Sequence, residues 1–147
     1  MGGIVARLGI IGAVIVGGII LRPFISGDAG GLQVGDCFDP PTTVSETVED
    51  VQHHPCTDAH GAEVVYVGKY APDTATYPTD DEFYAFFETN CGPAFNAYTG
   101  LDFLQATDYD MSAFTPTTEG WADNDRKIIC YAIRTDAAQM NASLKKE

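Results

Sequence analysis

The stretch from Thr79 to Gly100, TDDEFYAFFETNCGPAFNAYTG, has the periodicity of a helix, because its apolar residues recur at steps of three and four. Thr79 and Glu82 have the spacing of a capping box at its start, and Gly100 stands where a C-cap belongs. Pro93 lacks a backbone N–H and crowds the turn before it, so we expect the helix to kink or split near residues 89–92.

Runs rich in β-branched and aromatic residues, broken by Pro, Gly and Asp, predict strands on both sides of this helix. They cover residues 32–39, 47–54, 62–70 and 126–135, and a shorter strand is expected at 109–114 within an otherwise turn-rich segment. This order predicts an α+β fold, in which a small antiparallel sheet carries one broken helix packed on it. The last strand is apolar on both faces and is therefore expected to be central.

The amino-terminal 25 residues contain a continuous apolar run, LGIIGAVIVGGIIL, between Arg7 and Arg22. A helix over this run covers about 21 Å, so both arginines would have to extend towards the interface to span a hydrocarbon core of about 30 Å. A cleaved signal peptide is the alternative, because Gly27 and Ala29 are small enough for a peptidase site. The charge and the proline after the run favour an uncleaved transmembrane anchor over residues 1–25.

We expect a single-pass protein of the cell membrane, with its amino terminus in the cytoplasm and its remainder outside the cell. Residues 26–31 would be a flexible linker, residues 32–136 an extracytoplasmic domain, and residues 137–147 a polar tail that frays. Small residues recur every four positions in the anchor, which would let the helix of a membrane-protein partner approach closely. They are Gly9, Ala13 and Gly17.

The four cysteines are widely spaced, and none forms a CxxC pair. Behind a membrane signal, this pattern indicates two disulfides in an oxidising compartment rather than a zinc site. Three pairings are possible in principle. We favour Cys37 with Cys56, which would tie the first two strands together, and Cys91 with Cys130, which would join the helix to the last strand.

The part of the chain after Ser26 is strongly acidic. It holds all 21 Asp and Glu residues but only six of the eight Lys and Arg residues, which gives a net charge of −15. Such a surface repels nucleic acid, so we expect none as a partner. The lipid bilayer and another membrane protein are the partners that the sequence favours.

The run HHPCTDAHGAEVVYV, residues 53–67, gathers histidines, a cysteine and a glutamate ahead of a predicted strand. A disulfide at Cys56 would exclude a thiolate nucleophile there. His60 and Glu63 could ligate a metal, but positions three apart on a strand face opposite sides unless Gly61 supplies a turn. The interpretation as polar turn residues is therefore favoured, and we expect no cofactor.

Several ordered motifs resemble the septum-formation domain of membrane-anchored or secreted actinobacterial proteins. They are VGDCF at 34–38, then Cys56, His60, Glu63 and Val64, then Cys91, Pro116 and WADNDRKIIC at 121–130. The sequence departs from the family pattern at Ala59, where proline is usual, and at Asn124, where glycine is usual. The resemblance implies an extracytoplasmic, disulfide-linked module associated with cell division or the cell envelope. It transfers no catalytic residue.

Three classes of function follow. The favoured one is a non-catalytic envelope protein with an interaction module, or its variant as an accessory subunit of a larger membrane complex. The second is a metal-dependent hydrolase using His60 and Glu63, and the third is a ligand- or cation-binding sensor. Trp121, Asp125 and Arg126 would serve binding or folding, and we expect Arg126 to pair with a carboxylate such as Asp36.

Overall fold

A computed structural model describes residues 26–41 and 50–147 of the chain. The expected anchor over residues 1–25, with its small residues Gly9, Ala13 and Gly17, lies outside the described residues. Within the two described ranges, no helix combines the length and the apolar character that a membrane span requires.

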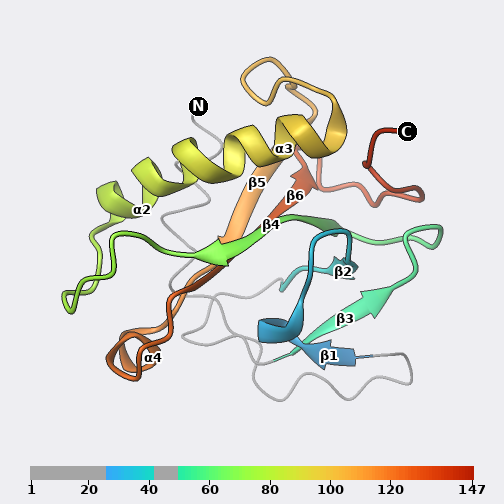
Figure 1. Cartoon of the computed structure of the whole chain (residues 1–147). Coiled ribbons are helices and arrows are strands. Elements are labelled where there is room, and N and C mark those ends of the chain that lie inside the picture. Colours follow the sequence, from blue (N-terminus) through green and yellow to red (C-terminus); the bar gives the residue numbers. More distant parts are fainter. Residues whose placement is uncertain (1–25, 42–49) are drawn as a thin grey trace.

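The strands form an antiparallel sheet, with β4 and β6 at its centre (Figure 1). Five strands follow the order β3-β2-β4-β6-β5, and the short β1 extends the sheet beyond β3. Their bounds are β1 Ser26–Asp28, β2 Cys37–Asp39, β3 Asp50–His54, β4 Ala62–Lys69, β5 Tyr109–Phe114 and β6 Lys127–Arg134. Six consecutive residues of β6 are buried, which confirms that the last strand is central.

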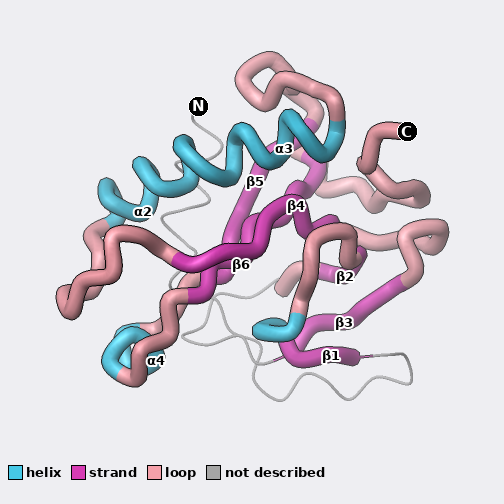
Figure 2. Tube along the Cα trace, viewed as in Figure 1, coloured by secondary structure: helices cyan, strands magenta, loops and turns pink. Residues whose placement is uncertain are grey.

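One long helical path crosses a face of this sheet (Figure 2). It consists of α2 (Asp80–Phe86), the π-helical turn η2 (Phe87–Cys91) and α3 (Gly92–Thr99). The capping box is present, because the Thr79 side chain accepts from the Glu82 N–H while the Glu82 carboxylate accepts from the Thr79 N–H. The π turn precedes Pro93 and is the predicted break, although the path continues through it.

Aromatic residues fill the space between this helix and the sheet. Tyr70 packs edge-on against Phe83 and Trp121, at centroid distances of 5.4 and 5.5 Å. Trp121 lies on α4 (Thr118–Ala122), a short helix capped by Thr117 that the sequence did not reveal within the turn-rich segment. A second apolar cluster of the sheet is built around Phe38 and Tyr131, whose rings meet at 5.1 Å.

Both ends of the predicted domain differ from the expectation. The expected tether forms β1 and the 3-10 turn η1 (Ala29–Gly31), and its Ala29 is buried. The expected fraying of the carboxyl-terminal tail is wrong, because Met140 is buried and exchanges two backbone hydrogen bonds with His60. Further on, the Lys146 N–H donates to the Tyr98 carbonyl at the end of α3 (Figure 1).

The two disulfides have the favoured pairing. Cys91 at the end of η2 is bonded to Cys130 in β6, which fastens the helix to the centre of the sheet. Cys37 in β2 is bonded to Cys56, which lies in the turn after β3. The first disulfide therefore joins the helix to the sheet across 39 positions, and the second joins the neighbouring segments of β2 and β3 across 19.

Candidate functional site

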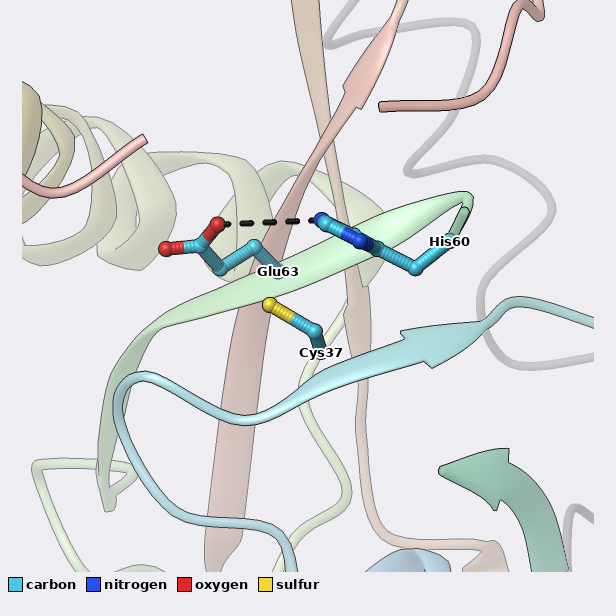
Figure 3. A group of neighbouring side chains, drawn as sticks. All are labelled: Cys37, His60 and Glu63. Carbon is cyan, nitrogen blue, oxygen red and sulfur yellow. Dashed lines mark ion pairs between the residues drawn. The ribbon is translucent and has the colours of Figure 1, made fainter. Parts of the chain in front are cut away.

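A buried polar group lies where β2 and β4 pair. Cys37 is directly opposite Glu63 in the antiparallel register, so their side chains share one face of the sheet. His60 lies just before β4, and its ring points towards the Glu63 carboxylate (Figure 3). We call these three residues, Cys37, His60 and Glu63, the buried centre. All three are 2% exposed or less.

His60 and Glu63 converge because the chain bends between them. His60 forms an isolated bridge with Met140, Gly61 lies in the bend, and β4 begins at Ala62. Gly61 is required by close contact, since a Cβ there would lie 2.7 Å from Cδ of Pro40. The turn that the metal interpretation needed is therefore present.

The His60 ring is oriented by one hydrogen bond and leaves one nitrogen without a partner. Nδ1 lies 2.8 Å from the Asp58 carbonyl oxygen, which can only accept, so Nδ1 carries the proton. Nε2 is buried without any hydrogen-bond partner, and it lies 3.9 Å from Oε1 of Glu63. In the neutral imidazole, this nitrogen presents a free lone pair to the buried centre.

The Glu63 carboxylate accepts three hydrogen bonds from other parts of the chain. The Tyr98 hydroxyl of α3 donates to Oε2 at 2.5 Å, and the Ser143 hydroxyl donates to the same oxygen at 2.7 Å. The Leu144 N–H donates to Oε1 at 2.9 Å. A buried carboxylate is costly unless it is hydrogen-bonded, and these donors supply the bonds that water would otherwise make.

The same contact changes the acidity of Tyr98. Burial raises the pKa of the Tyr98 hydroxyl to about 12, and the hydrogen bond to Glu63 adds to this effect. Tyr98 therefore remains a neutral donor to Glu63 across the physiological pH range.

The donor set of the buried centre is chemically suited to a metal. One ligand atom from each of Cys37, His60 and Glu63 lies within 4.8 Å of the other two. Among the described residues, no other group of three or more His, Cys, Asp and Glu side chains is this close. In the oxidised chain, however, the Cys37 sulfur is bonded to Cys56 and is not a thiolate, so only His60 and Glu63 offer good ligands.

The neighbouring histidines belong to the β2–β3 ladder instead. His53 pairs with Phe38 in the register, and His54 pairs with Cys37. Nε2 of His54 lies 2.8 Å from Oδ2 of Asp39. Neither histidine is part of the buried centre.

Trp121, Asp125 and Arg126 form a second motif cluster, at the other end of the sheet. The Arg126 guanidinium lies 3.7 Å from the Trp121 ring centroid. Arg126 pairs with a carboxylate as expected, but the partner is Asp73, to which its Nε donates at 2.9 Å. Asp36, the carboxylate named from the sequence, is the wrong partner, and it accepts locally from the Gln33 N–H.

The rest of this cluster shapes the turn into β6. Oδ1 of Asp125 accepts from the Lys127 N–H. Asn124 has φ 68°, a left-handed conformation that Asn tolerates and that explains why it can replace glycine. The cluster stabilises the turn into β6 and holds Arg126 in place. The polar groups of Asp125 and Arg126 described here already have hydrogen-bond partners within the chain.

These features define a small α+β domain that is fastened by two disulfides and closed around a buried histidine–glutamate pair. The chain belongs to the family described as septum formation, whose family model matches residues 34–147. Membership supports a role connected with cell division. The match includes the carboxyl-terminal segment, in agreement with its contacts to Glu63 and His60. No curated protein and no solved structure matches the chain.

Two partners of Glu63 were not identified from the sequence. Tyr98 was interpreted only as part of an apolar helix face, and Ser143 only as part of a polar tail. No local signal links either residue to Glu63, because their contacts span 35 and 80 positions of the chain. The place of Cys37 beside Glu63 depends on strand register, which the motif VGDCF does not specify.

Proposed function

We propose that this chain is a non-catalytic, single-pass envelope protein whose extracytoplasmic domain is an interaction module connected with septum formation. Residues 1–25 would anchor it in the cell membrane, with the amino terminus in the cytoplasm. The domain would then contact another component of the membrane or of the division apparatus.

One observation carries the non-catalytic part of this proposal: the motif residues are used within the fold. Cys37 and Cys130 are in disulfides, Glu63 accepts three hydrogen bonds from within the chain, and Trp121 is buried beneath Arg126. A hydrolase would need its acid, base or nucleophile to reach a substrate. Cys37, His60, Glu63, Trp121 and Cys130 are instead buried, which favours a rigid module over an enzyme.

Localisation in dividing cells tests the link to septum formation. A fluorescent protein fused to the amino terminus is preferable, because the carboxyl-terminal segment packs against Tyr98 and Glu63. We expect the fusion to concentrate at the division site of its native host. An even distribution around the envelope at every stage of division would contradict this role.

The orientation is tested by labelling intact cells with a membrane-impermeant maleimide. Glu119→Cys places a thiol at an exposed position of α4, and Gly2→Cys places one at the expected cytoplasmic end. We expect Glu119→Cys to react and Gly2→Cys to react only after the cells are opened. The reverse pattern would overturn the proposed topology.

The accessory-subunit variant depends on the stripe Gly9, Ala13 and Gly17. Bulky residues at two of these positions, in Ala13→Leu with Gly17→Leu, would keep the segment apolar but prevent close helix packing. We expect this variant to stay in the membrane and to lose its co-purifying membrane partner. Unchanged assembly would show that the stripe does not seat the protein in a complex.

A further inference from the structure

The buried centre lacks a free sulfur with which to bind a metal, because the sulfur of Cys37 is bonded to Cys56. Three ligand types are gathered there: a cysteine sulfur, an imidazole nitrogen and a carboxylate oxygen. Zinc binds these three types together, usually with four ligands in a tetrahedron. In the oxidised chain, the sulfur cannot serve because it is bonded to Cys56.

We propose that reduction of the Cys37–Cys56 disulfide converts the buried centre into a zinc site, with Cys37, His60 and Glu63 as ligands. Water would supply the fourth ligand, as it does in zinc sites with three protein ligands. This inference concerns a redox-dependent site and is independent of the proposed role in septum formation.

The hydrogen bonding of His60 is that of a histidine that ligates a metal. Metal-binding histidines usually donate their other ring N–H to a backbone carbonyl or a carboxylate, which fixes the ring and the tautomer. His60 does so through Nδ1 and Asp58, while Nε2 is fully buried and unpartnered. A buried nitrogen without a hydrogen bond is unfavourable, and a metal would satisfy it.

Glu63 is held in a comparable way. Tyr98 and Ser143 both donate to Oε2, whereas Oε1 has one donor, Leu144, and faces Nε2 of His60. The Oε1–Nε2 distance is 3.9 Å, and two ligands of a tetrahedral zinc ion are about 3.3–3.8 Å apart. A shift of a few tenths of an ångström in these two side chains would therefore bring their ligand atoms to the spacing that zinc requires.

The chemistry requires a thiol reductant. A dithiol would transfer two electrons and two protons to the Cys37–Cys56 disulfide, leaving two cysteine thiols and an oxidised dithiol. Binding of Zn²⁺ would then release the proton of the Cys37 thiol to solvent. The half-exposed Cys56 is the sulfur that a reductant can reach, and the turn that carries it would be released from β2.

The variant Cys56→Ser tests the site without a reductant and leaves Cys91–Cys130 closed. It frees the Cys37 thiol beside His60 and Glu63, with water available as a fourth ligand. After incubation of the full chain with Zn²⁺ and desalting, we expect about one zinc per chain. With Co²⁺ as the probe, we expect the absorption band of a cobalt–thiolate bond.

Three comparisons separate this site from adventitious binding. Disulfide-bonded wild type should bind zinc at least tenfold more weakly than Cys56→Ser. Cys37→Ser opens the same disulfide but removes the buried sulfur, and it should also bind at least tenfold more weakly. The double variant Cys56→Ser with His60→Gln should lose a similar factor, and circular dichroism of each variant checks that it is folded.

The proposal is overturned if Cys56→Ser retains no zinc, or if Cys37→Ser binds as tightly as Cys56→Ser does. Equal binding by the oxidised wild type would also overturn it, because the disulfide would then have no effect. Cys37→Ser decides the matter even where His60→Gln does not fold, since it leaves His60 and Glu63 in place. None of these outcomes bears on localisation at the septum.

Discussion

The hydroxyl of Ser143 donates a hydrogen bond to Oε2 of Glu63 over 2.7 Å, although 80 positions of the chain separate the two residues. With the Leu144 N–H on Oε1 and the bridge between Met140 and His60, this contact fastens the carboxyl-terminal segment over β4. The buried carboxylate is therefore a structural junction of the helix, the sheet and the end of the chain.

Replacement of this carboxylate should be strongly destabilising. Glu63→Ala leaves the donors of Tyr98, Ser143 and Leu144 without their acceptor in a buried place, so we expect the free energy of unfolding to fall by about 3 kcal/mol. Glu88→Ala, at an exposed helix position, is the matched control and should change it by less than about 0.5 kcal/mol. Urea denaturation of both variants measures the difference, and equal stabilities would refute the structural role of Glu63.

Shortening the chain tests the same junction from its other side. A chain ending at Ala142 lacks two of the three donors to Glu63 and the half-buried Leu144, and we expect a loss of about 2–3 kcal/mol. Removal of Glu147 alone keeps these donors and the Lys146 N–H on Tyr98, so it should have little effect. If both truncations melt at the wild-type temperature, the segment does not contribute to the fold.

Tyr98 should give this junction an alkaline pH dependence. Its pKa is raised from 10.0 to about 12, first by burial and then by the hydrogen bond to Glu63, with the charges of Glu63 and Asp36 acting in the same direction. The unfolded chain therefore releases the phenol proton at a lower pH than the folded chain does. The stabilisation is complete below pH 10 and is lost as the pH rises from 10 through about 12.

The variant Tyr98→Phe isolates this effect, because other tyrosines with raised pKa values, such as Tyr66 and Tyr70, titrate in both proteins. At neutral pH the variant should be less stable than wild type by about 1–2 kcal/mol, since Glu63 loses a donor. The difference should narrow above pH 10. A constant difference between pH 8 and pH 12 would show that the Tyr98 phenol does not titrate as the geometry implies.

The sequence predicted those parts of the fold that depend on neighbouring residues. The capping box of Thr79 and Glu82 and the C-cap at Gly100 are local devices, and both are present with the expected geometry. Pro93 acts on the turn directly before it, so the position of the break was also predictable. The favoured pairing of the cysteines, which was one of three that the sequence left open, is the one observed.

What the sequence could not reveal depends on contacts between distant segments. The tail after Asp136 has no apolar periodicity, and it is ordered by a carboxylate that belongs to β4. Arg126 pairs with Asp73 rather than Asp36 because the loop before α2 passes beside α4. No local pattern in the sequence specifies that the loop lies there. The buried centre likewise requires the register that sets Cys37 against Glu63.

The two disulfides should differ in their contribution to stability. Chain entropy favours the bridge that closes the longer loop, and the separations are 39 residues for Cys91–Cys130 and 19 for Cys37–Cys56. Replacement of both cysteines by alanine should cost about 4 kcal/mol for the first pair and about 3 kcal/mol for the second. Denaturation of the two double variants gives the order, and a larger loss at Cys37–Cys56 would contradict it.

Arg126 should stabilise the domain through Trp121 and backbone carbonyls rather than through its ion pair. Its guanidinium lies over the Trp121 ring and donates to the carbonyls of Trp121 and Thr74, whereas its carboxylate partner Asp73 is 81% exposed. Lysine keeps the charge but not the planar fork, so Arg126→Lys should cost about 1–2 kcal/mol. Asp73→Asn removes only a solvent-screened pair and should cost less than about 0.5 kcal/mol.

Thermal unfolding of the two variants distinguishes these contributions. If Asp73→Asn destabilises the protein as much as Arg126→Lys does, the ion pair is the dominant interaction and the stacking on Trp121 is secondary. If Arg126→Lys alone lowers the melting temperature, the arginine acts as a planar bridge between α4 and the loop at Thr74. The second outcome is expected, because the guanidinium side chain is only 10% exposed and its carbonyl partners remain fixed in the fold.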